Sequence, residues 1–251
     1  MITISANGLT FKQLNEKIKK AIREGVTEIK LKNVNGQRYI GDGLKNQVNI
    51  EISGTPGNDL GAFMDGATII VHNNACDGVG NTMNSGLIVV EGDARDIIGY
   101  GMRGGKIFIK GNVGYRVGIH MKEYQDKVPI IVAGGSAKDF LGEYMAGGIL
   151  LLLGLPQYVN DELAGNFIGT GMHGGVIYIR GKVEEHKLGL GAKFGELTEG
   201  DIAKLKELVE EYCKYFSAKV EEIINDLTNF TKIIPVSHRP YGKMYTHYTT
   251  E

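Results

Sequence analysis

The sequence predicts an all-β core folded as a right-handed parallel β-helix of about seven coils, with an N-terminal helical cap and C-terminal helices. Three observations predict this fold: a glycine-centred repeat, strand-like alternation after each repeat, and a high glycine content. The 251 residues include 37 glycines, about twice the usual share. We expect the excess glycine to serve the turns of a chain that winds on itself.

The repeat consists of an aliphatic residue, a glycine and, three residues after the glycine, a methionine or leucine. Successive glycines are 20, 19, 19, 19, 24 and 27 residues apart, which indicates a regular repeat with two late insertions. Six of the eight methionines fall into this register. The seven anchors are Ile40-Gly41/Leu44, Leu60-Gly61/Met64, Val79-Gly80/Met83, Ile98-Gly99/Met102, Val117-Gly118/Met121, Leu141-Gly142/Met145 and Ile168-Gly169/Met172.

Five of the seven anchors are followed, five or six residues later, by a second glycine (Gly66, Gly86, Gly105, Gly148 and Gly175) that opens a short apolar run. The runs have period two. Residues 106–110 are typical: Ile107 and Ile109 alternate with Lys106, Phe108 and Lys110, as in a strand with one buried face. A repeat of about 19 residues at roughly 3.3 Å each is too long for one strand, so each repeat must turn corners. Stacking the coils should place the methionines in one inner ladder. A left-handed hexapeptide helix is set aside, because the stretch from Gly80 to Gly118 shows no aliphatic residue every six.

Helical regions flank the repeats within a single domain that covers residues 1–251, with a cap over 1–34, the β-helix over 35–195 and a C-terminal segment over 196–251. Thr10 to Arg23 reads as an amphipathic helix with a Thr10/Gln13 capping box. A strand is expected over 26–34, and C-terminal helices are expected from Thr198 and over 220–227. We expect both helical regions to cover the exposed ends of the solenoid.

Charge and cysteine content narrow the classes of partner. With 28 basic and 29 acidic side chains, the chain gives no electrostatic reason to expect nucleic acid or a membrane surface as partner. No secretion signal precedes Thr10, and the longest apolar run, Ile149 to Leu153, is too short to span a bilayer. Two cysteines, Cys76 and Cys213, suit a reducing compartment, so we expect a cytoplasmic protein.

The residues that could bind metal are better explained by the fold. No C-x-x-C or H-x-x-x-H spacing occurs. His120 and His173 adjoin Met121 and Met172, and we expect them to be corner residues that point outward. The methionine ladder is expected to fill the core rather than to bind copper(I).

Other motifs with a chemical interpretation are weak. Gly99-x-Gly101 and Gly169-x-Gly171 resemble parts of phosphate-binding loops, but strands follow them instead of helices. Cys76 lies in an expected corner and is interpreted as structural or incidental. A polysaccharide-lyase groove would need charged residues in register on neighbouring coils, and the candidates fall at differing offsets. Those candidates are Arg95-Asp96, Arg103, Arg116 and Lys138-Asp139. We therefore assign no catalytic, cofactor-binding or metal residue to this chain.

The two insertions in the repeat are more informative about function than any single reactive residue. They cover 122–128 (KEYQDKV) and 155–164 (LPQYVNDELA), and insertions in solenoids often form loops on one face that binds a partner. We expect them to form a partner-contact surface, although tolerated loops without a role explain them equally well.

The stretch from Gly54 to Gly181 contains GTPGNDLGAFMDGATIIVHNNACDGVGNT, GYGMRGGKIFIKGNVGYRVGIHMKEY and DFLGEYMAGG. It resembles the GXGXG β-helix domain that ends the large subunit of glutamate synthase. Residues 196–241, with a helix pair and a strand over Phe230 to Pro235, are similar to the closing segment of that domain. The chain particularly resembles the stand-alone version found in archaeal-type glutamate synthases.

This resemblance implies a non-catalytic structural subunit that braces two separate chains. A glutamine amidotransferase chain and a synthase chain with FMN and an iron–sulfur cluster would together convert glutamine and 2-oxoglutarate to glutamate. No cofactor is implied for this chain itself. The alternatives are the β-helix C subunit of a formylmethanofuran-dehydrogenase-like complex and a self-assembling β-helix scaffold.

Overall fold

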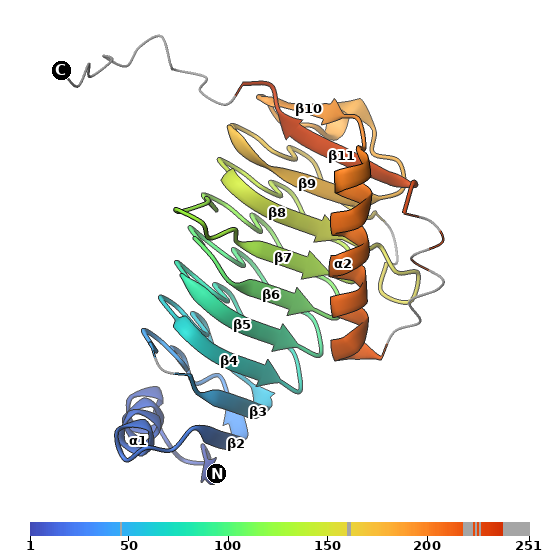
Figure 1. Cartoon of the computed structure of the whole chain (residues 1–251). Coiled ribbons are helices and arrows are strands. Elements are labelled where there is room, and N and C mark those ends of the chain that lie inside the picture. Colours follow the sequence, from blue (N-terminus) through green and yellow to red (C-terminus); the bar gives the residue numbers. More distant parts are fainter. Residues whose placement is uncertain (46, 160–161, 218–222, 224, 226, 238–251) are drawn as a thin grey trace, which may run out of the picture.

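The computed structural model of the chain is a parallel β-helix with one helix at its N-terminal end and a second helix along its side (Figure 1). The structure describes residues 1–45, 47–159, 162–217, 223, 225 and 227–237. The expected fold class is thereby confirmed.

Eleven strands form one sheet in the order β1-β2-β3-β4-β5-β6-β7-β8-β9-β11-β10. Neighbours from β1 to β9 pair in parallel, whereas β11 pairs antiparallel with both β9 and β10. The strands are β1 (Ile2–Ser5), β2 (Glu28–Asn35), β3 (Asn49–Thr55), β4 (Asp65–Val71), β5 (Ser85–Val90), β6 (Lys106–Ile109), β7 (Ile130–Ala133), β8 (Ala146–Leu152), β9 (Gly174–Arg180), β10 (Ala192–Gly195) and β11 (Phe230–Pro235). The sequence did not predict β1 and β10.

The repeat spacing sets the register between coils. Aliphatic residues pair with aliphatic residues through the stack, as in Ile69 with Ile88, Ile88 with Ile107 and Ile107 with Ile131. From β3 to β9 the chain makes six turns of solenoid, against the seven expected. The remaining anchor, Ile40-Gly41, lies in the connection from β2 to β3, at the end that the first helix covers.

The six anchor methionines line the interior, as the stacking argument predicts. Each is at most 1% exposed, and all belong to one apolar cluster with the inward residues of the strands. The anchor glycines adopt positive φ, between 67° and 79°, at every corner. A Cβ atom at these positions would clash with inward-pointing side chains. At Gly99, for example, it would lie 2.4 Å from Cδ1 of Ile131. Glycine is therefore required here for conformation and for space.

The helix α1 (Phe11–Arg23) closes the N-terminal end of the core, as expected. Thr10 and Gln13 form the predicted capping box, and Gly25 follows the helix at φ +86°. Leu14 and Ile18 are buried in the same cluster as the first strands. Asn15 donates a hydrogen bond to the backbone oxygen of Arg38 at 2.9 Å, which ties α1 to the first corner.

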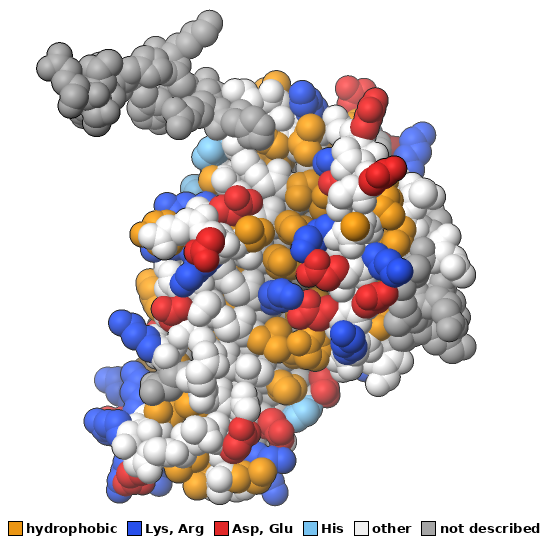
Figure 2. Space-filling model, viewed as in Figure 1, with side chains coloured by type: hydrophobic (Ala, Val, Ile, Leu, Met, Phe, Trp, Pro, Cys, Tyr) orange, Lys and Arg blue, Asp and Glu red, His pale blue; other side chains and the backbone are white. Residues whose placement is uncertain are grey.

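The helix α2 (Glu199–Phe216) starts after its N-cap Thr198, where the sequence predicted a helix to begin, but it does not cap an end. It lies along the outer face of the sheet across β6 to β9 (Figures 1 and 2). Its residues Leu205, Leu208, Val209 and Tyr212 form a second buried cluster with outward-facing residues of those strands. The outward-facing partners are Phe108, Val132, Leu151 and Tyr178.

The prediction of one buried face per strand was therefore wrong for these coils. Their outward residues are apolar because a helix covers them, and β7 is buried along its whole length. The hydroxyl of Tyr212 donates to the backbone oxygen of Lys110 at 2.7 Å, and Gly134 makes room for it. Lys106 and Glu211 form an ion pair at 2.6 Å beside the cluster.

The C-terminal end of the solenoid is closed by β11 and β10 instead of by helices. Most of the helix expected over 220–227 lies outside the described residues, but Ile223 and Leu227 are buried against the α2 cluster. The predicted strand Phe230 to Pro235 is confirmed as β11. Within the part of the chain that the structure describes, no helix is both long and apolar enough to cross a bilayer.

Candidate protein-contact surface

The charged corner residues join neighbouring coils. Asp96 accepts a hydrogen bond from the backbone N–H of Tyr115 at 3.0 Å, and Asp139 accepts one from Asn166 at 2.8 Å. A Cβ at Gly114 would lie 2.0 Å from the Asp96 carboxylate, so the glycine is needed for this contact. Carboxylates used in this way stabilise the stack and do not form the open row of ligands that a lyase groove requires.

The basic residues considered for a lyase groove also lie in different environments. The exposed Arg95 side chain lies 3.4 Å from the half-buried Asp77. Arg103 follows Met102, and its Nε is buried without a hydrogen-bond partner among the described residues. Arg116 pairs with Glu143 on the next coil.

The other candidate groups occupy the positions expected of structural residues. His120 is exposed at a corner, whereas His173 is half-buried, with Nδ1 3.4 Å from the backbone oxygen of Gly171. Among the described residues, no three His, Cys, Asp or Glu side chains gather closely enough to hold a metal ion. Cys76 and Cys213 are both free thiols, and burial raises the pKa of Cys213. A raised pKa disfavours the reactive thiolate.

The two insertions do not share a face. Residues 122–128 precede β7 and form a short hairpin with a bridge between Tyr124 and Lys127, whereas residues 155–164 follow β8. They therefore leave the sheet at opposite strand ends (Figure 1). Leu155 and Tyr158 of the second insertion pack into the α2 cluster, so its described part covers the core. The expectation of a joint contact surface was wrong.

Aromatic side chains instead form a row at the corners of four successive coils; all are exposed except Phe140, which is half-buried. We call this row the aromatic edge. It consists of Tyr100, Tyr115, His120, Phe140, Tyr144 and Phe167. Tyr115, Tyr144 and Phe167 are 47–51% exposed. Exposed aromatic clusters of this kind are typical of protein interfaces.

Ring contacts connect the members of the aromatic edge across coils. The ring of His120 stacks on Tyr144 at 5.3 Å between centroids and meets Tyr100 edge-on at 5.9 Å. Phe140 stacks on Phe167 at 4.9 Å. These contacts restrict the rotamers of the rings before any partner arrives, which reduces the entropy lost on binding.

A charged pair lies within the aromatic edge. The guanidinium of Arg116 lies 4.6 Å from the centre of the Phe140 ring and pairs with the carboxylate of Glu143. Glu143 is 7% exposed, whereas the Arg116 side chain is 44% exposed. The surface therefore combines aromatic rings with a fixed, partly exposed guanidinium, the composition most frequent in binding hot spots.

The backbone under the aromatic edge is strained. Arg116, His120, Phe140, Tyr144 and Phe167 all have φ between 51° and 65°. Non-glycine residues in this region cost about 1–2 kcal/mol each relative to glycine. The same conformation occurs at Tyr39, Phe63 and Ile97 on earlier corners, so the repeating corner geometry imposes it whichever side chain is present.

The family model described as the GXGXG motif matches residues 10–236. The chain belongs to the GXGXG family. It is also 54% identical over 252 residues to the uncharacterized protein MJ1350 of Methanocaldococcus jannaschii, covering 98% of this chain and 96% of that protein.

The GXGXG pattern has a direct structural meaning in this family member. Each corner has positive φ at three alternate positions, namely the anchor glycine and the residues two before and two after it. No corner of the seven carries glycine at all three positions. Gly99 and Gly101 fill two of them on one coil, whereas His120 and Tyr144 replace the last glycine on the next two coils.

The aromatic edge of this GXGXG protein was missed in the sequence, although a signal was present. Aromatic or basic residues replace glycine at the first position in Arg116, Phe140 and Phe167, and at the last position in His120 and Tyr144. Tyr39 and Phe63 hold the same positions on the first two corners, so what distinguishes the later coils is that aromatic or basic residues follow one another on neighbouring coils.

Proposed function

We propose that this chain is a non-catalytic structural subunit of a glutamate-synthase-like assembly. In this assembly it braces a glutamine amidotransferase chain and an FMN-binding synthase chain that together make glutamate from glutamine and 2-oxoglutarate. Membership of the GXGXG family carries the proposal. The cofactors, FMN and an iron–sulfur cluster, belong to the partner chains in this proposal.

The architecture supports a bracing role. The interior is filled by aliphatic and methionine side chains, and a second apolar cluster under α2 stiffens the outer face. Each coil contacts its neighbours through a continuous sheet, so the stack can act as a rigid spacer. Rigid solenoids offer long surfaces on which partner chains can be held in a fixed arrangement.

The aromatic edge is the surface we assign to the partner contact. It spans four coils and presents rings that are restrained by stacking and by Arg116. Aromatic and arginine side chains of this kind dominate the binding energy of protein interfaces. We expect the rings to insert into apolar pockets of one partner chain.

Phe167→Ala is expected to weaken retention of the partner chain at least tenfold in affinity purification of the tagged protein. Loss of a hot-spot aromatic costs about 2 kcal/mol or more of binding energy, and about 1.4 kcal/mol is tenfold. The matched control is Phe63→Ala, because Phe63 is 54% exposed with φ 56° on an early coil, while Phe167 is 51% exposed with φ 61°. Equal retention by both variants would remove the aromatic edge from the interface.

A further inference from the structure

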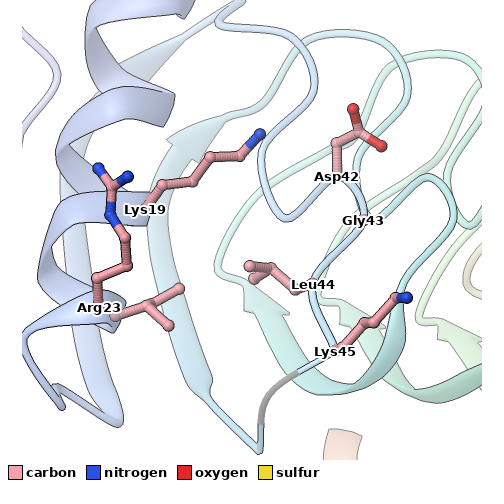
Figure 3. A pocket seen from close by; sticks show the side chains of 7 residues that line it. Lys19, Arg23, Asp42, Gly43, Leu44 and Lys45 are labelled. Carbon is pink, nitrogen blue, oxygen red and sulfur yellow. The ribbon is translucent and has the colours of Figure 1, made fainter.

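A second surface lies at the N-terminal end of the solenoid, whereas the aromatic edge lies at the corners of later coils. Between α1 and the first corner runs a groove of about 510 Å³, lined by Lys19, Ile22, Arg23, Asp42, Gly43, Leu44 and Lys45 (Figure 3). Lys19 and Arg23 come from the last turns of α1, and Asp42 to Lys45 come from the corner that follows Ile40-Gly41. The groove therefore exists only while α1 is seated on the solenoid.

The basic side chains of this groove form no close ion pair among the described residues, although Lys19 acts on Asp42 and Lys45 on Asp65 at longer range. Lys19, Arg23 and Lys45 are exposed and form no ion pair within 4 Å among the described residues. Neighbouring cations behave differently, since Lys30 pairs with Glu51 at 3.0 Å and Lys20 with Glu24 at 3.8 Å. Arg23 stabilises the C-terminal end of the α1 dipole, but that end carries only about half a negative charge. Positive charge thus remains available at this surface.

The charge at this end of the molecule is strongly one-sided. The first 45 residues contain nine Lys and Arg against four Asp and Glu, whereas the whole chain has a net charge of -1. Lys and Arg side chains gather around the α1 end in Figure 2. A positive field at one end steers and orients a negatively charged partner.

The apolar floor and the carboxylate of the groove narrow the class of ligand. Leu44 is 6% exposed and Ile22 is half-buried, so an aliphatic side chain can cover them. Burial raises the pKa of Asp42, a shift that Lys19 opposes and Asp59 reinforces. This acidic side chain repels a compact polyanion at one end of the groove. An extended segment can instead place its own carboxylates opposite the three cations and its N–H groups near Asp42.

We propose that this groove docks an acidic polypeptide segment of a partner protein, with carboxylates on Lys19, Arg23 and Lys45 and an aliphatic side chain on Ile22 and Leu44. The segment would bridge α1 and the first corner and would hold the N-terminal cap in place. The site is separate from the aromatic edge, which lies on later coils, and does not depend on the assembly proposed above.

The test uses a fluorescein-labelled peptide of Glu-Glu-Leu repeats and measures its binding to the full chain by fluorescence anisotropy. Lys19→Glu with Lys45→Glu should weaken binding about tenfold, because two attractive charge contacts become repulsive. The neutral pair Lys19→Gln with Lys45→Gln should give a smaller loss. The matched control is Lys206→Glu with Lys214→Glu, two exposed α2 positions that change the net charge equally.

Several outcomes would overturn the proposal. One is equal affinity of the wild type and the Lys19/Lys45 variant, with unchanged melting temperatures. Another is equal binding of a Gln-Gln-Leu peptide. Tighter binding of single-stranded DNA or of inorganic phosphate, in competition with the acidic peptide, would assign the groove to another anion. Phe167→Ala should leave peptide affinity unchanged, which separates this site from the aromatic edge.

Discussion

Replacing Gly86 with alanine is expected to lower the free energy of unfolding by about 4 kcal/mol. Gly86 has φ +106°, a conformation that L-residues rarely adopt, and its Cβ would lie 2.3 Å from the backbone oxygen of Ala67. Backbone strain contributes about 1–3 kcal/mol, and overpacking adds about 1–3 kcal/mol. The atom struck belongs to the neighbouring strand β4 and is held in place by the sheet. Urea denaturation followed by circular dichroism measures the change.

Gly36→Ala separates strain from collision in the same experiment. Gly36 also has positive φ, at +77°, but no atom lies within 4 Å of the position that its Cβ would occupy. The Gly36→Ala variant should therefore lose only about 1–2 kcal/mol of unfolding free energy. If Gly86→Ala were no more destabilising than Gly36→Ala, the tight contact between β4 and β5 would be refuted.

Asp201→Ala is expected to destabilise the protein by about 3–5 kcal/mol, since it leaves a buried lysine unpaired. Asp201 caps α2 through Thr198, pairs with Lys232 of β11 at 2.6 Å and accepts a hydrogen bond from Tyr178 of β9. The two charged side chains are only 10% and 15% exposed. One carboxylate thus joins three elements at the C-terminal end. Glu199→Ala, an exposed change in the same helical turn, should cost under 1 kcal/mol.

The stabilisation that Asp201 provides is expected to disappear in acid. Burial alone raises the pKa of Asp201, but the contacts with Lys232, Tyr178 and Thr198 outweigh it and hold the pKa well below its ordinary value of 3.8. A depressed folded-state pKa stabilises the protein at pH values above 3.8 and loses this effect as the pH falls below that value. The wild type should therefore lose its advantage over Asp201→Ala in acid. A difference that stays constant down to low pH would contradict the assigned contacts.

The sequence predicted the solenoid because its signals are local and repeated. Each corner needs glycine at positive φ, and each interior position of a coil stacks on an equivalent one. Glycine and methionine therefore recur every 19 or 20 residues until the two insertions lengthen the spacing to 24 and 27. The capping box at Thr10 was visible for the same reason, since it depends on residues three apart. The capping box between Thr198 and Asp201 was not predicted.

The position of α2 could not be predicted in this way. Its stripe of Leu205, Leu208 and Tyr212 indicated a buried face but not which surface buries it. The partner was encoded in the outward residues Phe108 and Tyr178, which are too large and apolar for a solvated sheet face. That inference requires the three-dimensional register of four coils.

The aromatic edge could not be predicted either, because it also depends on the register of the coils. Arg116, Phe140 and Phe167 are separated by 24 and 27 residues, because the insertions lengthen these coils. The corner backbone brings them onto one surface only after the insertions are looped out. Positions relative to each anchor glycine, and not sequence distance, reveal the row.

Affinity purification of the tagged protein from its own cells, at native abundance, tests the proposed function most directly. The co-purifying chains are identified by mass spectrometry, and the flavin absorbance of the sample is recorded. The account predicts a glutamine amidotransferase chain and an FMN-containing, iron–sulfur synthase chain in constant ratio to the tagged protein. Recovery of the protein alone, or together with molybdopterin-type subunits, would contradict the glutamate-synthase-like assignment.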